Sequence, residues 1–293
     1  MNRSRLAVLA LLSVAAAWGS TFFLTKDLLT RMDVADYLAL RFLIASAALL
    51  LVHPPAIARL SRLDRGRAVA LGITYGIAQL VQTEGLRHTP ASVSGFVTGM
   101  YVVFTPLLAA VILRHKIGRW AWVAVVLATV GLGVLSLRGF TLGTGELLTL
   151  ASAGLYALHI IGLGAWSTPE NAFGLSALQM VVITCVCAVG AIPGGFSVPG
   201  NAVDWISVVY MALIAGALAL IVQTWAQAHL TPTRAAIAMT MEPVFASTFA
   251  VMFGSEHVTW RMLTGGALVL AAMFLVELAP RRKFEAEVQH LAQ

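Results

Sequence analysis

The chain has 293 residues, of which 59% are hydrophobic and only 11% are charged. An ordinary soluble domain is about 25% charged, so this composition indicates an integral membrane protein and excludes a soluble enzyme. The net charge of +6 does not indicate a nucleic-acid partner, because its distribution along the chain fits orientation in a membrane.

Apolar stretches of about 20 residues, the length that spans a bilayer as a helix, follow one another along the chain. They cover Leu6–Thr25, Tyr37–Val52, Ala68–Leu86, Ala91–Leu113, Trp120–Leu137, Glu146–Trp166, Phe173–Ile192, Trp205–Leu230, Thr233–Phe253 and Val258–Leu278. The segments between them are short. We therefore expect one all-α integral membrane unit with ten transmembrane helices.

The second half of the chain repeats the first. Leu80–Thr83 (Leu-Val-Gln-Thr) returns as Ile221–Thr224 (Ile-Val-Gln-Thr) at an offset of about 141, and Ala17-Trp18 corresponds to Leu155-Tyr156 at a similar offset. A unit with an odd number of spans leaves the membrane on the side opposite to its entry, so the second copy must be inverted. We expect two inverted five-helix repeats, residues 1–140 and 141–280, followed by a cytoplasmic tail, 281–293. Inverted repeats are typical of secondary transporters, whose site lies between the halves.

Basic residues are distributed unevenly between the predicted loops. With the N-terminus in the cytoplasm, thirteen Lys and Arg lie inside, five lie outside, and Arg41 falls within a span. This bias follows the positive-inside rule. We expect a multi-pass protein of the cell membrane, the inner membrane in a bacterium, with both termini cytoplasmic. The first apolar segment has a repeat partner at Glu146–Trp166, so we interpret it as part of the fold and not as a secretory signal.

Polar and aromatic side chains recur at helical spacing inside the predicted spans, where a polar group that faced lipid would be costly. Such stripes on helices of both halves predict a shared central cavity. The predicted substrate-binding residues are Trp18, Thr21, Tyr75, Gln79, Gln82, Thr98, Tyr101, Tyr156, His159, Gln223, Gln227, Met239 and Glu242. For a single Gln or Thr, hydrogen bonding between helices is the alternative. Neutral amides, hydroxyls and aromatic rings suit a zwitterion with an apolar side chain, and they lack the fixed charge that a phosphate ester would require.

The ionisable and proline residues within spans have several interpretations. Glu242 could bind a substrate ammonium, carry a proton, or stay protonated and donate to a backbone carbonyl. Arg41 is expected to snorkel to the membrane surface, and His159 to be a hydrogen-bonded interior residue and not a metal ligand. Pro106 and Pro243, in the fourth and ninth spans, are the expected hinges, because proline interrupts the helical hydrogen bonds.

Motifs of membrane enzymes are missing from the sequence. It has no HExxH, no glycine-rich phosphate loop, and no glycine two positions before the serine of Ser94-Gly95. Cys185 and Cys187 are two residues apart on one span and point in different directions, so neither a disulfide nor a metal site is expected. The sequence therefore predicts no catalytic residue, no metal and no cofactor.

Five short segments lie in order on the predicted spans: Trp18–Phe22, Leu40–Ala45, Gly85–Thr89, Thr98–Val103 and Met241–Ala246. Together they resemble the EamA-like branch of the drug/metabolite transporter superfamily over essentially the whole chain, although Arg114-His115-Lys116 stands where that family commonly has Gly-Glu-Arg. The resemblance implies two inverted five-helix repeats with cytoplasmic termini and a cavity lined by the first, third, fourth, sixth, eighth and ninth helices. It also implies export of small metabolites, often amino acids, as in the YddG-type exporters.

The sequence thus predicts a transporter that exports small amphipathic metabolites, amino acids first among them, by alternating access. A multidrug or nucleotide-sugar carrier of the same fold is the alternative, and a polytopic membrane enzyme or a scaffold is the rival class. The expected partners are a small-molecule substrate and the lipid bilayer, without nucleic acid. The oligomeric state is open, with a monomer among the options.

Overall fold

The computed structural model describes residues 3–112, 119–136, 143–168, 170–191, 196–227 and 238–278. In chain order its elements are α1 (Arg3–Leu28), α2 (Val34–Val52), η1 (Pro54–Ala56), α3 (Arg62–His88), α4 (Ala91–Thr98), α5 (Tyr101–Ile112), α6 (Arg119–Ser136), α7 (Thr144–Trp166), α8 (Ala172–Ala191), α9 (Ala202–Ala212), the π-helical η3 (Leu213–Leu218), α10 (Ala219–Gln227), α12 (Glu242–Phe253) and α13 (Trp260–Leu278). These ranges contain no strand, so the predicted all-helical fold is confirmed.

Several of these helices have the length and composition of membrane spans. Six helical segments are long and apolar enough to cross a bilayer: Arg5–Leu28, Val34–Val52, Ala91–Ile112, Thr144–Trp166, Ala172–Ala191 and Ala202–Gln223. Three shorter apolar helices accompany them, and α3 has 27 residues but is more polar. Large apolar side chains such as Trp122, Val126 and Val130 of α6 are exposed on the surface. A soluble monomer rarely exposes such a surface, so the structure is that of a multi-pass membrane protein.

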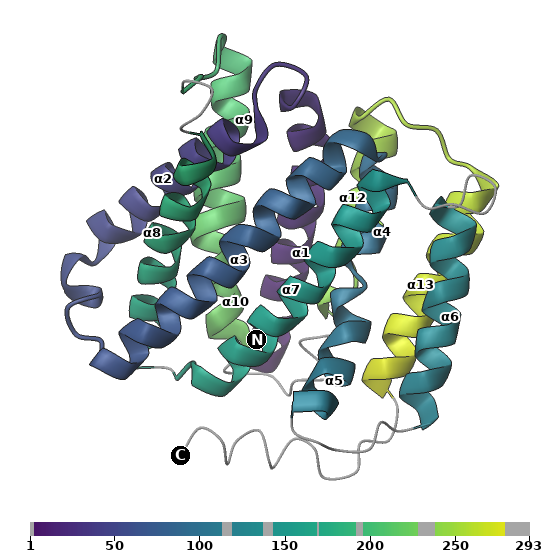
Figure 1. The fold of residues 1–293 in the computed structure, drawn as a ribbon, viewed down its shortest axis with the longest axis horizontal. Helices are drawn as coiled ribbons and strands as arrows, with labels where there is room; N and C mark the ends of the chain where they lie inside the picture. The colour runs from purple at the N-terminus through teal and green to yellow at the C-terminus, as the bar shows by residue number, and fades with distance from the viewer. Residues whose placement is uncertain are drawn as a thin grey trace.

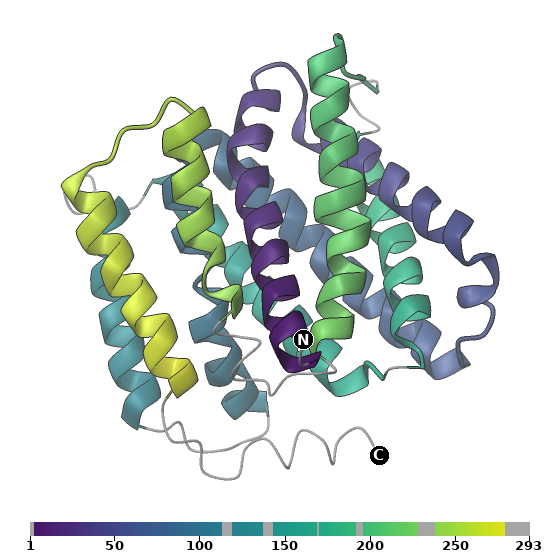
Figure 2. The ribbon, with the colours of Figure 1, turned by 180° about the vertical axis from the view of Figure 1, so that it is seen from behind.

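The helices form one bundle in which distant parts of the chain pack together. The pair α6 and α13 stands at one edge, and α2 packs against α8 at the other (Figure 1). Between these edges α3 packs along α7 (Figure 1) and α1 along α12, and the view from behind shows the second pair in front (Figure 2). The start of α1, the turn from α2 to α3 and the start of α6 lie at the same end of the bundle (Figure 1), which is the end predicted to be cytoplasmic.

Glycines allow two of these helix pairs to approach closely. A Cβ atom added to Gly145 of α7 would lie 2.8 Å from the carbonyl oxygen of Gly85 in α3. Gly131 of α6 and Gly265 of α13 face each other in the same way, each 2.9 Å from the other's carbonyl oxygen when a Cβ is added. Small residues at such crossings let backbones pack against each other without side chains between them.

The predicted fourth span is divided into two helices. α4 ends at Thr98 and α5 begins at Tyr101, with Gly99 and Met100 in a turn between them. Around this turn the chain makes i→i+3 hydrogen bonds, among them Val102 N–H to the carbonyl of Gly99 at 3.0 Å, which wind it more tightly than an α-helix. The interruption therefore comes before Pro106, which lies inside α5.

The predicted ninth span also differs from the structure. α12 begins at Glu242 with Pro243 in its first turn, a position where proline removes no helical hydrogen bond. Pro243 thus lies at the start of a helix, whereas the sequence predicted a bend in the middle of a span. The hinge role of both prolines stays a prediction. Residues 228–237 and the predicted tail, 281–293, lie outside the described ranges.

Candidate functional site

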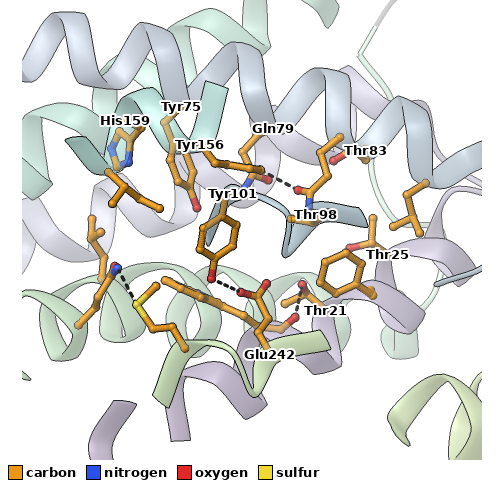
Figure 3. A pocket seen from close by; sticks show the side chains of 18 of the residues that line it. Thr21, Thr25, Tyr75, Gln79, Thr83, Thr98, Tyr101, Tyr156, His159 and Glu242 are labelled. Carbon is orange, nitrogen blue, oxygen red and sulfur yellow. Dashed lines mark hydrogen bonds between the residues drawn. The ribbon is translucent and has the colours of Figure 1, made fainter. Parts of the chain in front are cut away.

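A cavity lies among the helices near the middle of the bundle (Figure 3). It contains about 820 Å³ of empty space, its opening to solvent included. Helices of both halves of the chain supply its lining, which consists of Trp18, Thr21, Phe22, Thr25, Arg41, Tyr75, Gln79, Gln82, Thr83, Leu86, Thr98, Tyr101, Tyr156, His159, Ile160, Leu220, Gln223, Met239 and Glu242.

The structure brings together every predicted substrate-binding residue except Gln227. Gln227 is the last residue of α10, and its side chain lies outside the described part of the chain. The lining also contains residues that the prediction did not name: Phe22, Thr25, Arg41, Thr83, Leu86, Ile160 and Leu220. The apolar ones could not be recognised in advance, because spans rich in Leu, Ile and Phe give no signal that separates a cavity wall from a lipid-facing surface.

A chain of hydrogen bonds forms one wall of the cavity. Tyr156 of α7 donates its hydroxyl proton to Oε1 of Gln82 in α3 at 2.7 Å, and Nε2 of Gln82 donates to the hydroxyl of Thr98 in α4 at 3.0 Å (Figure 3). The amide of Gln82 is therefore oriented by a partner at each end. This wall connects the first half of the chain to the second.

A second polar contact crosses the cavity. The hydroxyl of Tyr101 donates to Oε2 of Glu242 at 3.1 Å, and both residues are buried (Figure 3). Each is the first residue of its helix, Tyr101 in α5 and Glu242 in α12. The first turn of a helix lies at the positive end of the helix dipole, which offsets part of the cost of burying a negative charge on Glu242.

Aromatic rings close the cavity on the side of α3 and α7. The ring centroid of Tyr75 lies 5.3 Å from that of Tyr156 and 4.9 Å from that of His159, within the range of stabilising aromatic pairs. Nε2 of His159 is 2.8 Å from Oε1 of Gln179, so this buried histidine is hydrogen-bonded. Among the described residues no three His, Cys, Asp or Glu side chains are arranged to hold a metal ion.

Arg41 does not reach the membrane surface, contrary to the prediction. It is only 7% exposed and lines the cavity. Its Nε donates to the carbonyl oxygen of Met211 at 3.3 Å, and its Nη1 donates to the hydroxyl of Tyr37 at 3.2 Å. The reason is the packing of α2 against α8, α9 and η3, which turns this face of α2 into the bundle. In the predicted span Tyr37–Val52, Arg41 lies just over one turn from the end, a position compatible with either direction, so the sequence alone could not decide.

Backbone carbonyls in and just before the π-helical segment η3 accept hydrogen bonds from side chains of the cavity wall. Nε1 of Trp18 in α1 donates to the carbonyl oxygen of Ala215 within η3 at 2.9 Å, and the Met211 carbonyl that accepts from Arg41 lies two residues before η3 begins. π-helical turns inside α-helices occur frequently at functional sites. Here η3 anchors Trp18 and the end of α9 just before it anchors Arg41, two cavity residues from the first half of the chain.

Charged residues connect helices at the end of the bundle where α1 ends and α9 begins. Nη2 of Arg31 lies 2.7 Å from Oδ1 of Asp204, and this hydrogen-bonded pair, together with Asp27, raises the pKa of Arg31 above its usual value. Nζ of Lys26 donates to the carbonyl oxygens of Leu86, Arg87 and Thr89 at 2.8–3.0 Å, which satisfies the end of α3. Glu256 accepts from the backbone N–H of Ala91 at 2.6 Å and so caps α4.

Comparison with known proteins identifies the family. The EamA-like transporter family matches the chain twice, over residues 5–137 and 143–278. An uncharacterized transporter of Archaeoglobus fulgidus is 29% identical over 93% of this chain and 86% of its own. A probable terminal-alkyne amino-acid exporter of Streptantibioticus cattleyicolor is 26% identical over 92% of this chain and 93% of its own. One crystal structure of a protein shares the fold, with a TM-score of 0.67 and 16% identity over 92% of this chain and 96% of its own. The chain belongs to the EamA-like transporter family.

Proposed function

We propose that this membrane transporter exports small amphipathic metabolites, with amino acids as the first candidates. The observation that carries the proposal is the buried cavity lined by hydroxyls, amides and aromatic rings from both halves of the chain. Its mixed lining suits a molecule with a polar backbone and an apolar side chain. A relative named as a probable amino-acid exporter, 26% identical to this chain, supports the same substrate class.

The proposed mechanism is alternating access between two inverted five-helix repeats. In that arrangement the contacts between the two repeats should occur in pairs that the pseudo-twofold axis relates to each other. The packing supports this: α1 contacts α12 while α7 contacts α4 and α5, and the repeat-related helices contact each other in the pairs α2–α8 and α6–α13. The hydrogen bond between Tyr101 and Glu242 also joins residues 141 positions apart, the offset of the sequence repeat.

Opening of the cavity to the outside would then require the contacts at the outer end to separate. With both termini in the cytoplasm, the pair of Arg31 and Asp204 lies at the extracellular end, and it links the turn after α1 to the start of α9. The side chain of Arg31 is 42% exposed and that of Asp204 only 4%, so salt screens the pair in part. Opening at this end would require the pair to break and re-form during each transport cycle.

A counterflow assay with the purified protein in liposomes tests the proposal. Liposomes loaded with an unlabelled amino acid should accumulate the labelled form, and protein-free liposomes should not. A panel of amino acids, nucleotide sugars and cationic drugs separates the substrate classes. Anionic metabolites belong in the panel because Arg41 gives the cavity a positive charge. Counterflow of nucleotide sugars or drugs without amino acids would contradict the substrate class, and absence of counterflow with all compounds would contradict transport.

A further inference from the structure

On the basis of the proposed transport function, we infer that Arg41 and Glu242 are the two charged poles of the substrate site. Arg41 binds the carboxylate of an amino-acid zwitterion, and Glu242 binds its ammonium group. The inference rests on the position of the two side chains in one cavity, their burial and the hydrogen-bonding capacity that each retains.

Arg41 retains donors that a ligand could use. A guanidinium group has five N–H donors, and in the described part of the chain Arg41 uses its Nε and its Nη1, toward a backbone carbonyl and a tyrosine hydroxyl. None of the described carboxylates forms an ion pair with it. Arg31 is different, because its Nε and Nη2 bind both carboxylate oxygens of Asp204 at 3.0 and 2.7 Å. A buried cation without a carboxylate partner is costly unless an anion completes its environment.

Glu242 has the opposite charge in the same cavity. Its carboxylate accepts one hydrogen bond from Tyr101, while a carboxylate has lone pairs for about four. No described Lys, Arg or His forms an ion pair with it. An ammonium group brings three donors and a positive charge, and it would therefore satisfy the acceptors that Tyr101 leaves open.

Arg41 and Glu242 line one cavity together with Tyr75 and Tyr156. A zwitterion carries a positive and a negative group, so it can satisfy both the Arg41 guanidinium and the Glu242 carboxylate, whereas a singly charged ligand can satisfy only one of them. Phe22, Leu86, Ile160 and Leu220 line the rest of the cavity and leave an apolar space for the side chain.

Removing one charge at a time from ligand and protein tests the assignment. The probes are L-leucine, L-leucinamide, which lacks the carboxylate, and isocaproate, which lacks the ammonium group. Their affinities are measured by microscale thermophoresis on the full-length protein in detergent. The natural protein should bind leucine more tightly than either analogue. Arg41→Gln should weaken leucine binding about 10- to 100-fold, the effect of losing a hydrogen bond between charged groups, and change leucinamide binding little. Glu242→Gln should weaken leucine and leucinamide alike and leave isocaproate unchanged.

Tyr37→Phe is the matched control for Arg41. It removes a hydrogen bond to Nη1 but keeps the guanidinium charge, so the preference for leucine over leucinamide should persist. If Arg41→Gln does not fold, Arg41→Lys decides, because it keeps the charge and loses the two-pronged geometry. The preference should then decrease without disappearing.

Equal losses for leucine and leucinamide in Arg41→Gln would overturn the assignment and make Arg41 a structural residue. An unchanged preference in Arg41→Lys would overturn it as well. A natural protein that binds leucine no better than leucinamide also contradicts it. The proteoliposome counterflow panel is an independent measurement, so transport of amino acids in that assay would uphold the proposed function even when the assignment of Arg41 fails.

Discussion

Replacing Gly145 with alanine should destabilise the protein by separating α3 from α7. The atom closest to the added Cβ is the hydroxyl oxygen of Thr89, a side chain that can rotate away, but the Cβ would also lie 2.8 Å from the carbonyl oxygen of Gly85 and 3.0 Å from the carbonyl carbon of His88. These two are backbone atoms of α3, and rotation of a side chain cannot relieve their contact with the Cβ. Overpacking of this kind costs about 1–3 kcal/mol. Alanine has a better helix propensity than glycine, which gains about 1 kcal/mol, so the net effect should be a loss of stability over most of the range of the overpacking cost.

Gly154→Ala is the matched control on the same helix. A Cβ at Gly154 meets no atom within 4 Å, so only the gain in helix propensity applies and stability should stay equal or rise. The assay is thermal unfolding of both variants in the same detergent, and the expected difference in Tm is roughly 2–10 °C. Equal Tm values would show that α3 and α7 are not held together at this crossing, and the reasoning from close backbone approach would be wrong.

Three further predictions concern orientation and the cavity. Single cysteines placed at Ser61 and Gln293 should resist a membrane-impermeant thiol reagent in intact cells, and labelling of either would contradict the cytoplasmic termini. Gln82→Leu and Gln223→Leu should each reduce counterflow at least several-fold with little change in folded yield; normal transport by both would assign these residues to helix packing. Glu242→Gln should abolish both gradient-driven uptake and exchange of zwitterions, because the binding contact is lost; retention of exchange alone would instead indicate a role in proton coupling.

The composition of the cavity could be predicted because polar residues in a span have few alternatives to an inward orientation. Lipid offers no hydrogen-bond partner, so the stripes of Tyr75, Gln79 and Gln82 had to face other helices. In the structure these residues meet Thr98 and Tyr156 from other helices around one cavity. The sequence pattern was sufficient because the penalty for the opposite orientation is large.

The interruptions within the spans could not be predicted by the same reasoning. The hydrophobicity averaged over a window is high throughout Ala91–Leu113 and Thr233–Phe253, so each was predicted as one continuous span. Such an average contains no signal for the turn at Gly99 or for the start of a new helix at Glu242. Proline was taken as the sign of a bend, whereas in the first turn of a helix it is well accommodated. The orientation of Arg41 was likewise decided by the tertiary packing of α2, which is not encoded in the residues next to it.

The start of α12 explains how the protein can keep a carboxylate at the centre of a membrane domain. Transfer of Glu242 from water into the bundle is costly, but its position in the first turn of α12 places it at the positive end of the helix dipole. Tyr101 adds a hydrogen bond of 3.1 Å. These contacts offset part of the desolvation cost without supplying a countercharge, so the carboxylate still gains from a bound cation. A phosphate ester would be attracted by Arg41 and repelled by Glu242, and a simple amine would experience the reverse. A zwitterion is attracted by both, which is why the two charges together favour amino acids over singly charged metabolites.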